Sequence, residues 1–213
     1  MKGVLICGGT GSRLRPLTEI TNKSLLPVYD QPLIWYPMQT LLSAGITEIA
    51  VITGPEHMSQ ITKFLTFKEG SYNCNFVFKI QEKAGGIAQA LGIAEEFAAG
   101  DDVCAILGDN IFFDDLSTVI KSFKKGAHLF LKEVDDPERF GVAEVDADGK
   151  VLSLEEKPQN PKSSYAATGC YVYSNSCFEI IRNMQPSARG ELEITDLSKV
   201  FLERGELTAS VLE

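Results

Sequence analysis

The sequence predicts an α/β fold, a mixed and mainly parallel central sheet with helices on both faces. Short apolar runs alternate along the chain with longer segments of helical period, which is the pattern of parallel strands joined by helical crossovers. A glycine-rich loop directly follows the first run, at the kind of strand end where open α/β sheets bind ligands. With 213 residues, of which 44% are hydrophobic, the chain is long enough to bury its own core, and we expect one domain over residues 1–213.

The first two thirds of the chain predict alternating strands and helices. The expected strands cover residues 2–7, 48–53, 75–80, 103–107 and 127–133. A helix is expected over 32–44, where apolar residues recur at helical spacing and Gly45 provides a glycine stop. The next crossover helices are expected over 58–67, 87–98 and 116–124.

After about residue 134 the pattern changes to short pieces typical of antiparallel strands, so we expect the sheet to be mixed. Strands over 141–146 and 151–155 are joined by Asp146-Ala147-Asp148-Gly149, which favours a hairpin turn. A strand over 166–173 and helices over 176–183 and 190–203 follow, with a loop between the two helices. The last helix is expected to pack through one apolar side, formed by Leu192, Ile194, Leu197, Val200 and Phe201.

Charge and cysteine content narrow the classes of function. The 20 Lys and Arg residues face 29 Asp and Glu, a net charge of -9, so we expect no nucleic-acid partner, although a local phosphate site stays compatible with this balance. No apolar run approaches a signal-peptide core or a membrane span, which predicts a protein without a membrane partner. The five cysteines are scattered and lack C-x-x-C spacing, which disfavours zinc and favours a reducing, cytoplasmic setting.

The loop after the first strand reads Gly8-Gly9-Thr10-Gly11-Ser12-Arg13-Leu14-Arg15-Pro16. Glycines there allow positive φ and let backbone N–H groups surround phosphate oxygens, and Arg13 adds a cation that can bind phosphate through two parallel hydrogen bonds. No Lys-Ser/Thr pair follows the last glycine, as a Walker A loop requires. Asp30 leaves a dinucleotide-dependent oxidoreductase open as an alternative, but Leu14 and Pro16 disfavour the dinucleotide pattern.

Two further polar residues suit nucleotide chemistry. Asp109 ends the buried run Ala105-Ile106-Leu107-Gly108, so its carboxylate is expected to point into the crevice, where a hard oxygen ligand suits Mg²⁺. A turn or helix-capping aspartate is the alternative interpretation of this residue. Gln81 carries both a donor and an acceptor, which can pair with the imide edge of thymine or uracil.

The glycine-rich loop is followed closely by Lys23-Ser24-Leu25-Leu26-Pro27, and together the two segments resemble the signature of sugar-1-phosphate nucleotidylyltransferases. The resemblance is strongest to the members that act on glucose 1-phosphate at the start of dTDP-rhamnose synthesis. It spans nearly the whole chain in the order of the family, through Gln81-Glu82-Lys83-Ala84-Gly85-Gly86-Ile87-Ala88-Gln89-Ala90, Leu107-Gly108-Asp109-Asn110, Pro137-Glu138-Arg139-Phe140-Gly141-Val142, Glu155-Glu156-Lys157-Pro158 and Arg189-Gly190-Glu191-Leu192-Glu193-Ile194-Thr195-Asp196.

The resemblance implies a Rossmann-like fold of the nucleotide-diphospho-sugar transferase type. It implies transfer of a nucleotidyl group from dTTP to α-D-glucose 1-phosphate, with release of pyrophosphate, by a homo-oligomeric enzyme that uses Mg²⁺. The implied catalytic residues are Arg13, Lys23, Asp109 and Lys157, with Asp109 as the metal ligand. The implied nucleotide-binding residues are Gly8, Gly9, Gly11, Arg13, Gln81 and Gly86, and the implied sugar-binding residues are Asn110, Gly141, Glu156 and Lys157.

Two further alternatives stay open at this point. One is a UTP-dependent uridylyltransferase, because an imide edge is common to thymine and uracil. The other is a nucleotide-sugar binding protein or noncatalytic subunit. It is considered because the family carries a second magnesium aspartate in a Trp-x-Asp-x-Gly-like stretch, and this sequence stops at Glu213 before such a stretch. We therefore expect a nucleotidyltransferase domain that is short at its carboxyl end, with its activity open.

Overall fold

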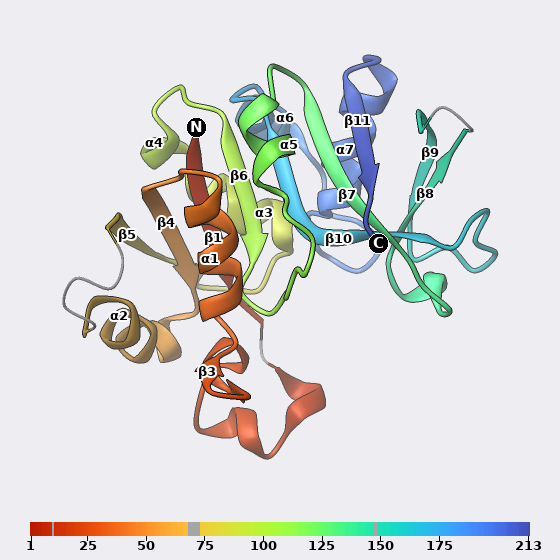
Figure 1. The fold of residues 1–213 in the computed structure, drawn as a ribbon. Helices are drawn as coiled ribbons and strands as arrows, with labels where there is room; N and C mark the ends of the chain where they lie inside the picture. The colour runs from red at the N-terminus through yellow and green to blue at the C-terminus, as the bar shows by residue number, and fades with distance from the viewer. Residues whose placement is uncertain (10, 68–72, 147–148) are drawn as a thin grey trace.

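A nine-stranded mixed sheet forms the centre of the computed structural model, which describes residues 1–9, 11–67, 73–146 and 149–213 (Figure 1). The amino-terminal half of the sheet is parallel, with strand order β5-β4-β1-β6. These strands are β1 (Lys2–Cys7), β4 (Glu48–Thr53), β5 (Asn75–Ile80) and β6 (Val103–Leu107). Because they are parallel, their carboxyl ends meet at one edge, and the loops that follow β1 and β6 lie side by side.

The carboxyl-terminal half of the sheet makes it mixed, as predicted. Strand β10 (Tyr165–Tyr173) runs antiparallel between β6 and β7 (Ala127–Glu133), and β11 (Leu207–Val211) adds to β7 in parallel. The antiparallel pair β8 (Gly141–Val145) and β9 (Val151–Glu156) branches from β10 and projects at the end of the sheet opposite β5 (Figure 1). A separate two-stranded ribbon is formed by β2 (Pro27–Val28) and β3 (Gln31–Pro32).

Helices cover both faces of the sheet, which confirms the predicted fold class. On one face lie α1 (Trp35–Ser43), α2 (Met58–Phe67) and α5 (Ser117–Ser122), and on the other lie α3 (Ile87–Gly92), α4 (Glu95–Ala98), α6 (Cys177–Asn183) and α7 (Ile194–Glu203). Side chains alternate along each strand, so Val4 and Ile6 join one core cluster while Leu5 and Cys7 join the other. Short 3₁₀ turns occupy Ser12–Leu14, Leu17–Glu19, Lys23–Leu25, Pro55–His57 and Pro137–Arg139.

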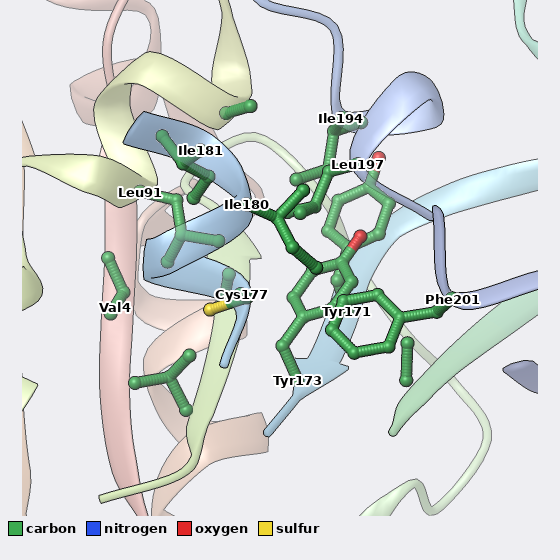
Figure 2. Packing of buried hydrophobic residues seen from close by; sticks show 14 of the residues in the cluster. Val4, Leu91, Tyr171, Tyr173, Cys177, Ile180, Ile181, Ile194, Leu197 and Phe201 are labelled. Carbon is green, nitrogen blue, oxygen red and sulfur yellow. The ribbon is translucent and has the colours of Figure 1, made fainter. Parts of the chain in front are cut away.

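The core under α7 is aromatic and fixes that helix to β10 (Figure 2). The rings of Tyr171 and Tyr173 stack with centroids 6.3 Å apart, and Phe201 of α7 lies 5.7 Å from Tyr173. The Tyr173 hydroxyl also shares a hydrogen bond of 2.6 Å with Ser198 Oγ on α7. Ile194, Leu197 and Phe201 are buried in this core, as expected for the predicted packing face. The middle and end of α7 are thereby held against Tyr173 at the carboxyl end of β10.

The predicted helices over 87–98 and 190–203 differ from the observed ones. The first divides into α3 and α4 at a turn over residues 93–94, and Gly92 at the end of α3 lies against α6, where a Cβ would be 3.0 Å from Ile181 Cγ2. The second begins only at Ile194, because the preceding backbone pairs elsewhere. The Leu192 N–H donates to the Gly85 carbonyl over 2.8 Å, and the Leu192 carbonyl accepts from the Ala88 N–H over 3.2 Å.

Two other sequence expectations concern single segments. The sequence does not predict strand β11 (Leu207–Val211), because this half-exposed run has no strong apolar pattern of its own. It becomes a strand by pairing with β7. The predicted hairpin turn lies partly outside the described residues, but its ends close as expected, with the Gly149 N–H 3.0 Å from the Asp146 carbonyl. Within the described ranges, no helix combines the length and apolar character needed to cross a bilayer.

Candidate active site

The glycine-rich loop leaves the carboxyl end of β1 and forms one wall of a cavity of about 260 Å³. Gly8 and Gly9 line this cavity, and Gly9 has a φ of +94° that favours glycine. Gly11, at φ +58°, has a different function in the loop. A Cβ there would lie 2.8 Å from Thr18 Cγ2, while the Thr18 hydroxyl donates to the Gly11 carbonyl over 2.8 Å. Gly11 is not among the described residues that line the two cavities of the site.

Lys23 is brought to the end of β6 by the side chain of Asn22. The buried Asn22 amide donates to the Cys7 carbonyl over 3.0 Å and accepts from the Ser24 N–H over 2.8 Å. This fixes the 3₁₀ turn that carries Lys23, whose Nζ donates to Asp109 Oδ2 over 2.6 Å. Since Asn110 Nδ2 donates to Asp109 Oδ1 over 2.9 Å, both carboxylate oxygens are oriented by neighbours.

A tight crossing of two loops places Asp109 at this position. A Cβ on Gly108 would lie 2.6 Å from Cys7 Sγ and 2.8 Å from Ser24 Oγ, so only glycine lets the end of β6 pass so close to the end of β1. Burial raises the pKa of the Cys7 thiol to about 12. Cys7 is therefore a buried packing residue, as its apolar run predicts, and not a nucleophile.

A second cavity, of about 480 Å³, meets the first at the Lys23–Asp109 pair. Both cavities are lined by Lys23, Ile87, Leu107 and Asp109. The second cavity also contains Arg13 and Lys157, so the structure brings the four predicted catalytic residues to one hollow. The chain reaches this arrangement from three separate segments, the loop after β1, the loop after β6 and the end of β9.

Gln81 and Gly86 line the first cavity and are not among the described residues that line the second. Gln81 is buried, and its Nε2 donates to the Gly86 carbonyl over 3.2 Å and to Gln89 Oε1 over 2.8 Å. Gly86 has φ +102°, and a Cβ there would collide with the Leu192 carbonyl. The segment before α3 is therefore tied to the segment before α7, which closes this side of the cavity.

The second cavity contains the predicted sugar-binding residues Asn110, Gly141, Glu156 and Lys157. The Thr195 hydroxyl donates a hydrogen bond to Glu156 Oε2 over 2.5 Å. Glycine at position 141 leaves room for this contact, because a Cβ on Gly141 would lie 2.6 Å from Thr195 Oγ1. Asn110 Oδ1 accepts from the Gly169 N–H over 3.0 Å. Gly169 belongs to the irregular stretch of β10 between Ala167 and Tyr171, where the pairing with β7 shifts.

Lys157 has a backbone conformation that its sequence context does not reveal. Its φ of +45° is left-handed, which is uncommon for a residue with a side chain and is found where the surroundings fix it. Its N–H donates to the Phe140 carbonyl over 2.8 Å, and its Nζ lies 3.8 Å from Glu156 Oε1. The strand β9 thus ends in a turn that presents the ammonium to the cavity.

Several further residues lie in or beside the site without a predicted role. Arg189, which is not among the described residues that line the two cavities, lies among three carboxylates, 3.3 Å from Glu156, 3.0 Å from Glu191 and 3.5 Å from Glu193. Glu193 and Thr195 line the second cavity, although no site role is predicted for the matching segment over 189–196 that holds them. Arg139, Lys132 and Thr168 line it as well.

Asp109 lies at the junction of the two cavities, whereas the other carboxylates that line them belong to Glu156, Glu191 and Glu193. In the part of the chain that the structure describes, no group of three or more His, Cys, Asp or Glu side chains is arranged to hold a metal ion. A magnesium ion at Asp109 would consequently take its other ligands from substrate phosphates and water, a donor set that Mg²⁺ commonly uses.

Comparison with known proteins identifies the family. The nucleotidyl transferase family model matches residues 2–213. Over its whole length, the chain is 44% identical to a glucose-1-phosphate thymidylyltransferase of Neisseria meningitidis and 46% identical to one of Neisseria gonorrhoeae, covering 75% of each.

A crystal structure from Bacillus anthracis, described as a glucose-1-phosphate thymidylyltransferase in complex with a sucrose, superposes with a TM-score of 0.93 at 49% identity, and this chain covers 87% of it. A UDP-glucose pyrophosphorylase structure shares the fold, with a TM-score of 0.87 at 23% identity. The chain belongs to the nucleotidyl transferase family, as its motifs predict.

Proposed function

We propose that this chain transfers a thymidylyl group from dTTP to α-D-glucose 1-phosphate, giving dTDP-glucose and pyrophosphate. The observation that carries the proposal is the pair of cavities that meet at Lys23 and Asp109. Two anionic reactants in adjacent hollows, with cations at the junction, are what an in-line displacement at phosphorus requires. The relatives above 40% identity carry the name of this activity, which supports the choice of substrates.

The first cavity takes the nucleotide in this proposal. The backbone of Gly8 and Gly9 follows the ligand closely because neither residue has a side chain, and Gln81 and Gly86 meet the base. The phosphates extend to the junction, where Lys23 binds them, and Arg13 binds them from the adjoining second cavity and stabilises the charge that develops on the departing pyrophosphate. Gly11 supports the loop through its contact with Thr18.

The second cavity takes the sugar 1-phosphate. Lys157 binds its phosphate, while Asn110, Glu156 and the backbone at Gly141 contact hydroxyl groups of the sugar. In the reaction, a phosphate oxygen of the sugar forms a bond to the α-phosphorus, and the bond from that phosphorus to the bridging oxygen of the β-phosphate breaks. The electron pair of this bond leaves with pyrophosphate. The enzyme's own part is to hold both reactants in line and to balance their charges.

Asp109 is the residue that would hold Mg²⁺. Its carboxylate is partly exposed at the junction of the cavities, where a hard oxygen ligand suits Mg²⁺. When bound, the ion supplies neutralisation of phosphate charge and alignment of the α-phosphate. Lys23, which pairs with Asp109 over 2.6 Å, would then be free to bind phosphate oxygens.

We further propose a reducing, cytoplasmic setting and a homo-oligomer. The five cysteines are all free thiols, which supports the reducing setting. The sequence resemblance supports the homo-oligomer. Light scattering of the purified protein tests the oligomer, and a monomer at micromolar concentration would contradict it.

A pyrophosphate-release assay tests the proposed reaction. The purified chain is incubated with Mg²⁺ and glucose 1-phosphate, and with dTTP or UTP in separate reactions, and Arg13→Ala serves as the matched variant. We expect release with dTTP, and a loss of orders of magnitude in the variant. Saturable dTTP binding by calorimetry without release would instead support a noncatalytic nucleotide-sugar binding protein, and faster release with UTP would indicate a uridylyltransferase.

A further inference from the structure

Two side-chain amides lie in contact at the wall of the first cavity. Gln81 is buried and lines the cavity, whereas Gln89 lies on α3 and is not among the described residues that line it. Gln81 Nε2 lies 2.8 Å from Gln89 Oε1 and 3.2 Å from the Gly86 carbonyl oxygen. Because an amide NH₂ has two hydrogens, both donors of Gln81 are used by acceptors of the protein.

The orientation of the Gln89 amide follows from the Gly85 backbone. The Gly85 N–H lies 3.0 Å from Gln89 Oε1, and a backbone N–H can only donate, so the Gln89 atom that it meets is the oxygen. This oxygen also faces Gln81, which must therefore present its NH₂ there. A Cβ on Gly85 would lie 2.6 Å from Gln89 Cδ, so glycine at this position is what lets the amide approach.

The same constraint leaves the oxygen of Gln81 on the side of Gly8. A Cβ on Gly8 would lie 2.7 Å from Gln81 Oε1, so this oxygen is accessible only because Gly8 has no side chain. Both residues line the first cavity. An acceptor at this position pairs with an N–H of the base, such as N3–H of thymine or uracil. It is mismatched to the unprotonated N3 of cytosine, which is itself an acceptor.

We propose that Gln89 is a positioning residue that fixes the orientation of the Gln81 amide, and through it selects an imide base over cytosine. This inference rests on the proposed function, because it places a nucleoside triphosphate in the first cavity. Gln89 acts without touching the ligand. Its oxygen holds the NH₂ of Gln81 on the protein side, and the Gly85 N–H holds that oxygen in turn.

Matched variants at Gln89 test the proposal. Gln89→Met has a similar length but lacks the acceptor, whereas Gln89→Glu keeps oxygens that accept from both Gly85 and Gln81. For the wild type and both variants, kcat/KM and the calorimetric Kd are measured with dTTP and with dCTP, and melting temperatures confirm folding. In Gln89→Met the Gln81 NH₂ keeps only its longer, 3.2 Å hydrogen bond to the Gly86 carbonyl. The amide can then rotate by half a turn and offer its NH₂ to cytosine, so the preference for dTTP over dCTP falls about tenfold or more. Gln89→Glu retains the preference.

A third variant keeps glutamine at position 89 but shifts its side-chain amide. Gly85→Ala displaces the Gln89 amide from the backbone N–H, and the preference for dTTP is expected to fall here too. An unchanged preference in Gln89→Met overturns the proposal, and so does an equal weakening of dTTP and dCTP binding, which would mark Gln89 as purely structural. A wild type that binds neither nucleotide in calorimetry overturns the proposed function, and this inference with it, so the two failures are distinguishable.

Discussion

At the scale of single residues, the site holds opposite charges next to one another at the junction of its two cavities. The side chains of Lys23 and Asp109 are 41% and 32% exposed, so their ion pair is screened by solvent and contributes little to folding. Such a pair can separate when phosphates arrive, at a small energetic cost. Its position, rather than its strength, is what matters for function.

This predicts a specific outcome for Asp109→Asn. The amide keeps the shape of the side chain but loses the charge that would hold Mg²⁺, so turnover is expected to fall by about a thousandfold or more. The melting temperature should change by no more than about 4 °C, because the lost ion pair is partly exposed. Steady-state kinetics and thermal unfolding measure the two effects, and turnover that stays at the wild-type level would contradict the metal assignment.

The left-handed Lys157 gives a second prediction, in which activity and stability separate. Both Lys157→Gly and Lys157→Ala remove the ammonium and should lower kcat/KM by two to three orders of magnitude, as loss of a phosphate-binding cation does. Glycine accepts a φ of +45° without strain while alanine does not, so the glycine variant should be more stable by about 1 kcal/mol. Chemical denaturation compares the two, and equal stability would indicate that the backbone is not strained.

At the scale of elements, β10 runs antiparallel beside β6 and carries the sheet to the wall of the second cavity. The irregular stretch of β10 turns the Gly169 N–H towards Asn110, and the hairpin of β8 and β9 brings Gly141 and Glu156 to the same place. Strand β11 completes the outer edge by pairing with β7. The edge strand is held there partly by His128 of β7, whose ring nitrogens lie 2.8 Å from Thr208 Oγ1 and 3.1 Å from Ser210 Oγ.

His128 makes the stability of this edge depend on pH. Burial lowers the pKa of His128 to about 4, because the buried ring disfavours the charged form. The unfolded chain, with an ordinary histidine pKa of about 6.5, binds the proton first as pH falls. The stabilising contribution is therefore complete above about pH 6.5, is lost progressively as pH falls towards 4, and amounts to about 3 kcal/mol at most.

Comparison with His128→Gln isolates this effect from the titration of carboxylates. The free energy of unfolding is measured for both proteins from pH 4 to pH 7.5. The advantage of the wild type should shrink steadily as the pH is lowered below about 6.5. A difference that stays constant across this range would show that His128 does not titrate on unfolding.

At the scale of the whole molecule, the two halves of the sheet contribute to one site. The parallel half supplies the glycine-rich loop and Asp109, and the antiparallel half supplies Lys157 and the wall of the second cavity at Gly141 and Glu156. A ligand that contacts both halves binds only the native state, so it should stabilise the entire chain by mass action.

Thermal unfolding with ligand tests this coupling. At a concentration about 100 times its Kd, dTTP with Mg²⁺ should stabilise the protein by about 2.7 kcal/mol and raise the melting temperature by about 5–10 °C. Chelation of Mg²⁺ with EDTA should remove most of this shift, and Lys23→Met should reduce it. A shift that survives chelation unchanged would argue against a magnesium-dependent nucleotide site.

Much of the architecture could be predicted from the sequence alone, because its signals are local. The burial and period of short runs predict the strands and helices, the ends of β1 and β6 predict where ligands bind, and ordered motifs predict the family. The burial of Cys7 and the apolar side of α7 also follow from local pattern. The roles of the individual site residues remain predictions until the variants are measured.

Other features were decided only by the tertiary structure, because they join residues that are far apart in the chain. Strand β11 exists through its pairing with β7, Gly92 at the end of α3 lies against Ile181 of α6, and α7 starts late because Leu192 bonds to the backbone before α3. The contact of Thr195 with Glu156 likewise spans distant segments. Even Gln81 and Gln89, close in sequence, become an oriented pair only when Gly85 and Gly86 fold between them. The periodicity of apolar residues predicts which face of a helix or strand is buried. Which other element packs against that face is decided by the packing of the whole molecule.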